Sequence, residues 1–95
     1  MRLEEKLISS IGTGEENGVS LAELMNITGL RNRPLRKLIE YLRRKGVVIC
    51  SNSHGYFKPS TLVELKCYIM QERARARSIY VTIESAEKLL RTWRN

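Results

Sequence analysis

The sequence of 95 residues contains no aspartate, a single histidine, His54, and only two cysteines, Cys50 and Cys67. A structural zinc site uses four nitrogen or sulfur ligands, which one chain of this composition cannot supply. No set of nucleophile, base and acid can be assembled either, so we expect neither an enzyme nor a cofactor. Isolated cysteines are typical of a reducing compartment, and we expect both as small buried or half-buried side chains.

Long hydrophobic runs are also absent, and no window is apolar for long enough to span a bilayer. The N-terminus carries Glu4 and Glu5 where a signal peptide would have its apolar run. We therefore expect a cytoplasmic protein with no membrane partner, and no pattern indicates a small-molecule ligand. Hydrophobic residues make up 42% of the chain, enough for the core of one small domain, with or without an appendage.

Acidic residues are in the minority: the chain has ten Glu and 17 Lys and Arg, which gives a net charge of +7. The excess is concentrated in residues 31–45, which hold seven basic residues and one acid, Glu40. Residues 1–30 are acidic by contrast, with two basic residues and five Glu. Focused positive charge indicates a polyanionic partner, and it favours nucleic acid over an anionic membrane surface.

Hydrophobic spacing predicts two helices in the acidic N-terminal part of the chain. The first covers residues 2–11. The second follows Ser20, which forms a capping box with Glu23. It ends near Gly29, because glycine adopts a positive φ without steric cost.

A third helix is predicted over residues 33–45, with Asn32 as its N-cap and Pro34 in its first turn. Its apolar stripe consists of Leu35, Leu38, Ile39 and Leu42. A β-hairpin follows, with strands at Val47–Cys50 and Tyr56–Lys58 and a polar turn between them.

The last third of the chain predicts one long helix over residues 62–93, capped by Thr61 and Glu64. Apolar residues recur there in alternating steps of three and four, which is the heptad pattern of a coiled coil, and Glu72 interrupts it. We expect Leu62, Leu65 and Ile69 to pack on the domain core, and a second copy of the chain to cover the rest. The candidate dimerisation residues are Ile69, Ala76, Ile79, Ile83, Ala86, Leu90 and Trp93. The β-branched run at residues 78–83 has poor helix propensity, so a break into two helices is an open alternative.

This order of elements predicts a mainly α fold with a small β-hairpin wing, a winged helix–turn–helix in residues 1–60 followed by a long C-terminal helix in residues 61–95. In such a fold the third helix enters the major groove of double-stranded DNA and the wing contacts the backbone. The candidate DNA-binding residues are Arg31, Asn32, Arg33, Arg36, Lys37, Arg44, Ser51, Asn52, Ser53, His54 and Lys58.

Four segments, residues 19–24, 35–43, 44–49 and 55–59, resemble the helix–turn–helix domain at the N-terminus of biotin-ligase repressors. The resemblance implies a DNA-binding winged-helix domain and no biotin chemistry. The whole chain is also similar to small winged-helix proteins of phages and prophages in Gram-positive bacteria. There the wing leads into a single helix with a pattern that this chain matches at residues 68–69 and 73–79, which implies the same architecture. From all these features we expect a sequence-specific, dimeric DNA-binding protein, a transcriptional regulator or a prophage-borne accessory factor.

Several positions have more than one interpretation. Arg44 lies where a helix C-terminus favours cations in any case, and for His54 an ordinary turn residue is the favoured interpretation over phosphate contact. Arg73, Arg75 and Arg77 are candidates for DNA contact, for ion pairs beside the dimer seam, or for plain solvation. The alternative to DNA binding is a protein-interaction module in a replication or recombination complex.

Overall fold

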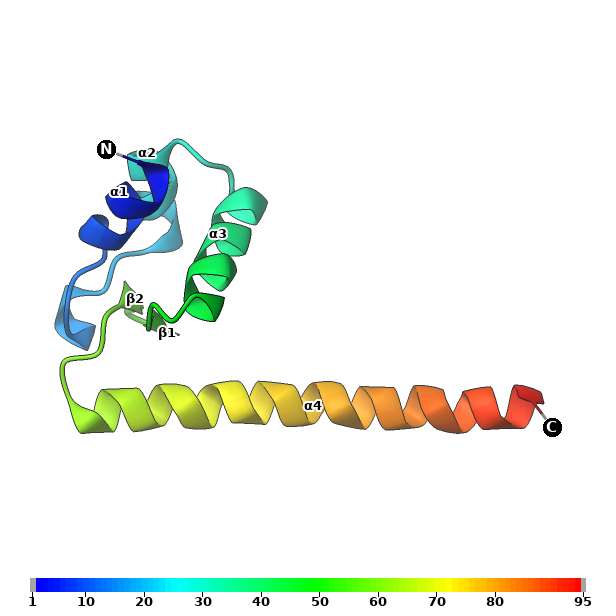
Figure 1. Cartoon of the computed structure of the whole chain (residues 1–95). Coiled ribbons are helices and arrows are strands. Elements are labelled where there is room, and N and C mark those ends of the chain that lie inside the picture. The colour runs from blue at the N-terminus through cyan, green and yellow to red at the C-terminus, as the bar shows by residue number, and fades with distance from the viewer. Residues whose placement is uncertain (1, 95) are drawn as a thin grey trace. The chain divides into compact units, whose positions relative to one another are not determined.

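The computed structural model describes residues 2–94 and confirms the expected fold class, mainly α with a small β-hairpin and a long C-terminal helix (Figure 1). The elements are α1 (Leu3–Ser10), a short 3-10 helix η1 (Glu15–Asn17), α2 (Leu21–Thr28), α3 (Asn32–Arg44), β1 (Cys50–Asn52), β2 (Gly55–Phe57) and α4 (Leu62–Arg94). The chain forms two compact units, of which the first reaches Leu65 and the second begins at Lys66. The first turn of α4 therefore belongs to the first unit, whereas the sequence placed the boundary after residue 60.

The ends of α2 follow the signals in the sequence. The Ser20 hydroxyl accepts a hydrogen bond from the backbone N–H of Glu23 at 3.1 Å, which satisfies one of the free donors at the start of the helix. Gly29 follows the last turn with a φ of 75° and donates its N–H to Met25. This left-handed cap ends the helix and starts the turn into α3.

The start of α3 differs from the expectation by one residue. Arg31 is the N-cap residue, with an extended backbone, and Asn32 already lies inside the helix. The Asn32 Oδ1 atom accepts a hydrogen bond from Arg36 Nε at 2.6 Å instead of capping a backbone N–H. The prediction that Asn32 caps α3 was therefore wrong, while Pro34 does lie in the first turn, where its missing N–H costs nothing.

The first unit has one hydrophobic core, to which all three short helices contribute. Its buried members are Leu7, Ile11, Leu24, Leu35, Ile39, Leu42 and Ile49. The apolar stripe predicted for α3 supplies three of them, and Leu38 packs at the edge of the core. Burial of this stripe fixes which face of α3 remains in water.

The hairpin is shifted by about three residues at its first strand relative to the prediction. β1 covers Cys50–Asn52 and β2 covers Gly55–Phe57, so that Asn52 and Gly55 are opposite each other and the turn is two residues long. The prediction that Val47–Ile49 belongs to the strand was wrong, because the backbone of this run forms hydrogen bonds with residues of α3 instead. Val47 donates its N–H to Leu42, and Arg43 donates to the carbonyl of Ile49.

A third segment pairs with the hairpin and ties it to α2. Val19 exchanges two backbone hydrogen bonds with Tyr56, at 2.9 and 2.8 Å, on the side of β2 away from β1. Gly55 makes this close approach possible, because its φ is 105° and a Cβ atom there would meet the Val19 carbonyl oxygen at 2.5 Å. These two bonds hold Val19 against β2.

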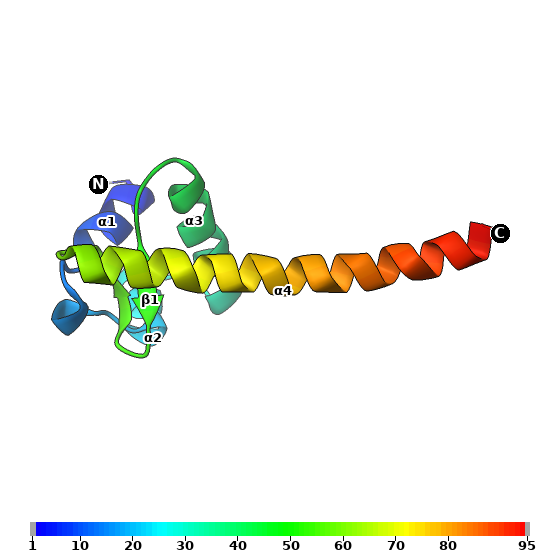
Figure 2. The same ribbon diagram turned by 90° about the horizontal axis from the view of Figure 1, so that it is seen from below.

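Helix α4 runs without interruption from Leu62 to Arg94, including the β-branched run at residues 78–83 (Figure 2). Thr61 caps it by accepting from the N–H of Glu64 at 3.1 Å. No residue between Leu62 and Arg94 is buried. Leu62 is 67% exposed, Leu65 is half-buried and Ile69 is exposed, so the expectation that all three pack on the core was wrong. In residues 2–94 no helix combines the length and apolarity that a membrane span requires.

Candidate nucleic-acid interface

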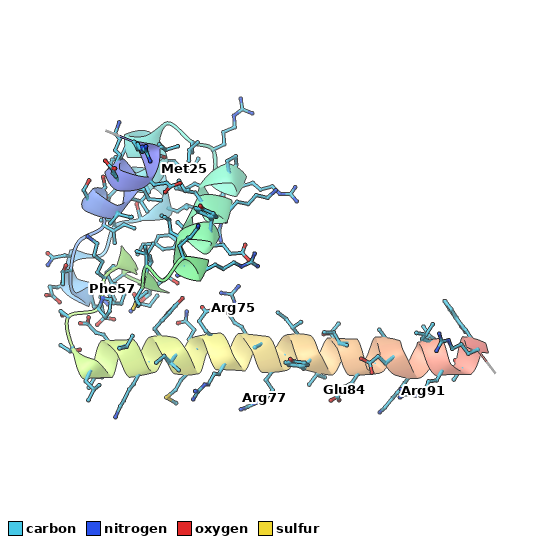
Figure 3. All side chains as sticks on the ribbon, viewed as in Figure 1. Met25, Phe57, Arg75, Arg77, Glu84 and Arg91 are labelled. Carbon is cyan, nitrogen blue, oxygen red and sulfur yellow. The ribbon has the colours of Figure 1, made fainter. Side chains whose placement is uncertain are left out.

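The outer face of α3 carries the densest group of cations in the first unit. Leu35, Ile39 and Leu42 turn its other face into the core, and the remaining polar side chains extend on the side away from α1 and α2 (Figure 3). The exposed polar residues of this face are Arg31, Asn32, Arg33, Arg36, Lys37, Glu40 and Arg44. We call the cations Arg31, Arg33, Arg36 and Lys37 the basic face of α3. The sequence predicted all four as site residues, and the helix brings them together at its N-terminal end.

The polar contacts on α3 separate these cations from Arg44. Within residues 2–94 neither Arg33 nor Lys37 has an ion-pair partner, and Arg36 is hydrogen-bonded only to the neutral amide of Asn32. Arg44 instead forms an ion pair with Glu40 at 2.7 Å, one turn earlier. The positive charge is therefore available to a ligand at the N-terminal half of α3 and is partly neutralised at the C-terminal half.

Arg43 has a structural position that the sequence did not reveal. Its Nε atom donates to the Ile49 carbonyl at 2.8 Å and its guanidinium also donates to the Ser51 hydroxyl at 3.2 Å. These bonds join the last turn of α3 to β1. The hydroxyl of Ser51, a predicted site residue, therefore already accepts a hydrogen bond within the protein. A sequence offers no sign of this, because the cation pattern of a helix C-terminus is the same whether the side chain is solvated or bonded.

The hairpin tip lies against an acidic residue of η1. Asn52 donates its side-chain amide to the Glu15 carboxylate, and His54 Nε2 lies 3.7 Å from the same carboxylate. The side-chain Oδ1 atom of Asn52 accepts a hydrogen bond from the backbone N–H of His54 at 2.8 Å and tightens the turn. Ser53 is exposed at the tip. Sequence reasoning missed Glu15, whose contact joins residues 37 positions apart in the chain.

Lys58 is half-buried, and its backbone continues the pairing beyond β2. Its N–H donates to Gly12 and its carbonyl accepts from Gly14, both at 2.8 Å. Together with the Val19 pairing, these bonds hold the base of the hairpin against the loop that follows α1. The candidate wing residues therefore lie on a hairpin that backbone hydrogen bonds hold in place, and its tip is the part exposed to solvent.

Glu64 secures the start of α4 to the first unit. Its carboxylate accepts hydrogen bonds from the backbone N–H groups of Ser60, at 3.0 Å, and Glu15, at 3.3 Å. These bonds favour the ionised form, and they lower the pKa of Glu64 below its usual value, with the Ser60 bond as the largest cause. The predicted capping box is thus confirmed at Thr61, with its return bond made to Ser60.

The two cysteines have different environments. Cys50 is buried, and burial raises the pKa of its thiol, so it is an inert member of the core. Cys67 is exposed, and the prediction of a buried or half-buried side chain was wrong for it because α4 buries none of its residues. In the part of the chain that the structure describes, no three His, Cys or acidic side chains gather as ligands for a metal ion.

The candidate dimerisation residues all lie on α4 and are accessible along its length. Within residues 66–94 this helix is the sole element. Arg75 forms an ion pair with Glu72 of its own helix at 3.2 Å. Arg77, Glu84 and Arg91, spaced by seven residues, project from a common side of α4 in Figure 3, outside the heptad seam.

Comparison with protein families, with curated proteins and with solved structures found no match to this chain.

Proposed function

We propose that this protein binds double-stranded DNA in a sequence-specific manner, as a homodimeric winged-helix protein of the kind that regulates transcription in phages and prophages. One observation carries the proposal: the basic face of α3 is exposed and largely without acidic partners, while the opposite face of the same helix forms the core. The resemblance of residues 19–59 to the DNA-binding domain of biotin-ligase repressors supports the same function.

The proposed mechanism places α3 in the major groove. An arginine there recognises guanine through two hydrogen bonds to the O6 and N7 atoms, and an asparagine recognises adenine in a similar way. Arg33, Arg36 and Asn32 occupy the N-terminal turns of α3, the part that usually reaches the base edges in this class of protein. Arg31 and Lys37 are suited to contact phosphates on either side of the groove.

The wing makes a smaller contribution in this proposal. Ser53 at the tip and Lys58 at the base are suited to phosphate contact. Asn52 and His54 remain candidates, but contact with DNA requires them to release the Glu15 carboxylate. We therefore assign most of the binding free energy to α3.

A binding experiment on duplex DNA tests the function. Fluorescence anisotropy with a random-sequence duplex should show binding that weakens steeply as salt rises, because each phosphate contact releases condensed cations. Selection from a random duplex pool should then enrich a defined sequence. Nonspecific binding to duplex DNA is strong enough to detect at about 50–100 mM salt. An absence of binding under these conditions would contradict the proposal.

A protein-interaction module is the second candidate, and the exposed apolar side chains of α4 favour it. Such a module would use α4 to bind a different protein in a replication or recombination complex, with little sequence preference for DNA. The two functions give different outcomes in the selection experiment, since the interaction module enriches no sequence.

A further inference from the structure

We propose that α4 pairs with α4 of a second copy in antiparallel orientation over its full length, with Leu62 of one chain opposite Trp93 of the partner subunit. The proposal deepens the homodimer of the proposed function and does not depend on DNA binding. It follows from the side chains that each orientation would place face to face in the heptad seam.

The helix needs a partner because it has no core of its own. An isolated helix is marginal in water, and most helices in proteins are stabilised by packing of an apolar face. In α4 no residue is buried, and Ile79 and Leu90 are 60% and 50% exposed. The β-branched run at residues 78–83 adds an intrinsic cost, yet the helix is continuous through it.

A parallel dimer in register would place each seam residue against its own copy, and three kinds of layer would be unfavourable. Glu72 would face Glu72 of the partner subunit, and like charges in direct contact destabilise a pair. Ala76 would face a second alanine, which leaves a void between the helices. Trp93 would face a second tryptophan, the largest side chain against itself.

The antiparallel arrangement removes all three problems. With full overlap, Glu72 faces Ile83 of the partner subunit, so the two carboxylates are far apart. Arg75 of the same helix, 3.2 Å from Glu72, compensates its charge at the edge of the seam. Each small residue meets a large one, since Ala76 faces Ile79 of the partner subunit. Ile69 faces Ala86 of the partner subunit in the same way, and such alternation fills a helix interface evenly.

The side chains that flank the seam also favour the antiparallel orientation. In that register Lys66 lies beside Glu87 of the partner subunit, once at each end, and forms a pair of opposite charge. Arg73 lies beside Tyr80 of the partner subunit, which allows a cation–π contact. The parallel register also allows cation–π contacts, of Tyr68 with Arg73 and of Arg75 with Tyr80, and it pairs Thr82 with Glu87, so what it lacks is the ion pair between the helices.

The orientation determines how far apart the two DNA-binding units are attached. At 1.5 Å per residue, the two Leu62 residues would be about 46 Å apart in the antiparallel dimer, against about 10 Å in a parallel one. An antiparallel dimer therefore predicts two half-sites that are well separated on DNA, or sites on two duplexes.

Disulfide cross-linking of the full chain tests the orientation. On a Cys67→Ser background, with Cys50 buried in the core, the single variants Ile69→Cys and Ala86→Cys, which keep Glu72, are oxidised alone and as an equal mixture, after light scattering has established the mass. Facing seam residues come within the Cα separation of about 4.4–6.8 Å that a disulfide requires. Val81→Cys, on the outer side of the helix, is the control that should remain unlinked.

The expected result is a dimer by light scattering that cross-links only in the mixture of the two variants. A dimer in which either variant cross-links efficiently alone overturns the antiparallel pairing and leaves the homodimer intact. A dimer that cross-links in none of the samples overturns the full-overlap register. A monomer at tens of micromolar overturns both this inference and the dimeric part of the proposed function, whereas the DNA-binding part is tested separately.

Discussion

Helices α3 and α4 are both amphipathic and both rich in cations, yet they differ in what covers their apolar side. The stripe of α3 lies in the core formed by α1, α2 and Ile49. The stripe of α4 has exposed residues at nearly every heptad position, from Leu62 to Trp93. An apolar face that is covered within the chain determines a fold, and one that is left open indicates an interface with another molecule.

The same comparison explains the role of charge. On α3 the cations occupy the face opposite a buried stripe, so they form a coherent positive surface at the N-terminal half of the helix. On α4 the seven basic residues of the C-terminal third are interspersed with four Glu, and Arg75 pairs with Glu72. The first pattern suits a polyanion, and the second suits a helix that pairs with its own copy.

The largest effect is expected from a charge in the seam of α4. Ile79→Glu should convert the proposed homodimer to a monomer at tens of micromolar, because two carboxylates would enter the seam without partners, at a cost of several kcal/mol. Val81→Glu is a matched control, since Val81 is 58% exposed against 60% for Ile79 but lies outside the seam. Light scattering and circular dichroism measure mass and helix content. Equal effects of the two variants would show that the heptad seam is not the interface.

A second contrast separates the two kinds of apolar side chain. Leu35→Ala should lower the free energy of unfolding of the first unit by about 2–5 kcal/mol, because Leu35 is fully buried. Leu90→Ala should act through association, so its effect should decrease as protein concentration rises. Urea unfolding at two concentrations measures both. An effect of Leu90→Ala that is independent of concentration would contradict an intermolecular role.

Adjacent arginines in α3 provide the next comparison. Arg43→Met should cost about 1–3 kcal/mol, because the Ile49 carbonyl and the Ser51 hydroxyl lose a charged donor. Arg44→Met should cost well under about 1 kcal/mol, since its ion pair with Glu40 is exposed. Thermal or urea unfolding of both variants measures the difference. Equal destabilisation would mean that Arg43 does not hold β1 to α3.

The smallest effect concerns the start of α4. The pKa of Glu64 is lower in the folded protein than its usual value of 4.5, so its contribution to stability is present above that value and is lost as the pH falls through the folded pKa. Glu64→Gln should remove this pH dependence and slightly destabilise the native protein at neutral pH. Unfolding measured between about pH 3 and 7 covers this range. An unchanged acid limb in the variant would show that Glu64 is not the titrating group.

Local signals in the sequence predicted the helices well and the hairpin less well. Ser20 and Gly29 predicted the ends of α2 because a cap depends on a few neighbouring residues. Val47–Ile49 misled the prediction, since β-branched residues suit a strand, whereas here they form a connection in which Ile49 is buried and Val48 is 45% exposed. The contacts of Arg43 and Glu15 join distant segments, and no local pattern contains that information.

The candidate interface was predictable to the extent that it depends on one helix. The basic face of α3 follows from residue spacing alone. The contacts of the hairpin tip cannot be predicted from residue spacing, because Glu15 comes close to Asn52 only when η1 folds against the hairpin. Whether α4 is continuous was also open, since propensity at residues 78–83 and the heptad pattern favour different answers.

The most direct test of DNA binding compares two triple variants that each remove three positive charges from a chain of net charge +7. Arg33→Ala, Arg36→Ala and Lys37→Ala together remove most of the basic face of α3. Arg77→Ala, Lys88→Ala and Arg91→Ala together remove the same charge from α4 outside the seam. In anisotropy titrations with a selected duplex, the first variant should lose binding and the second should retain it. Equal loss in both variants, or full binding by the first, would contradict recognition of DNA by α3.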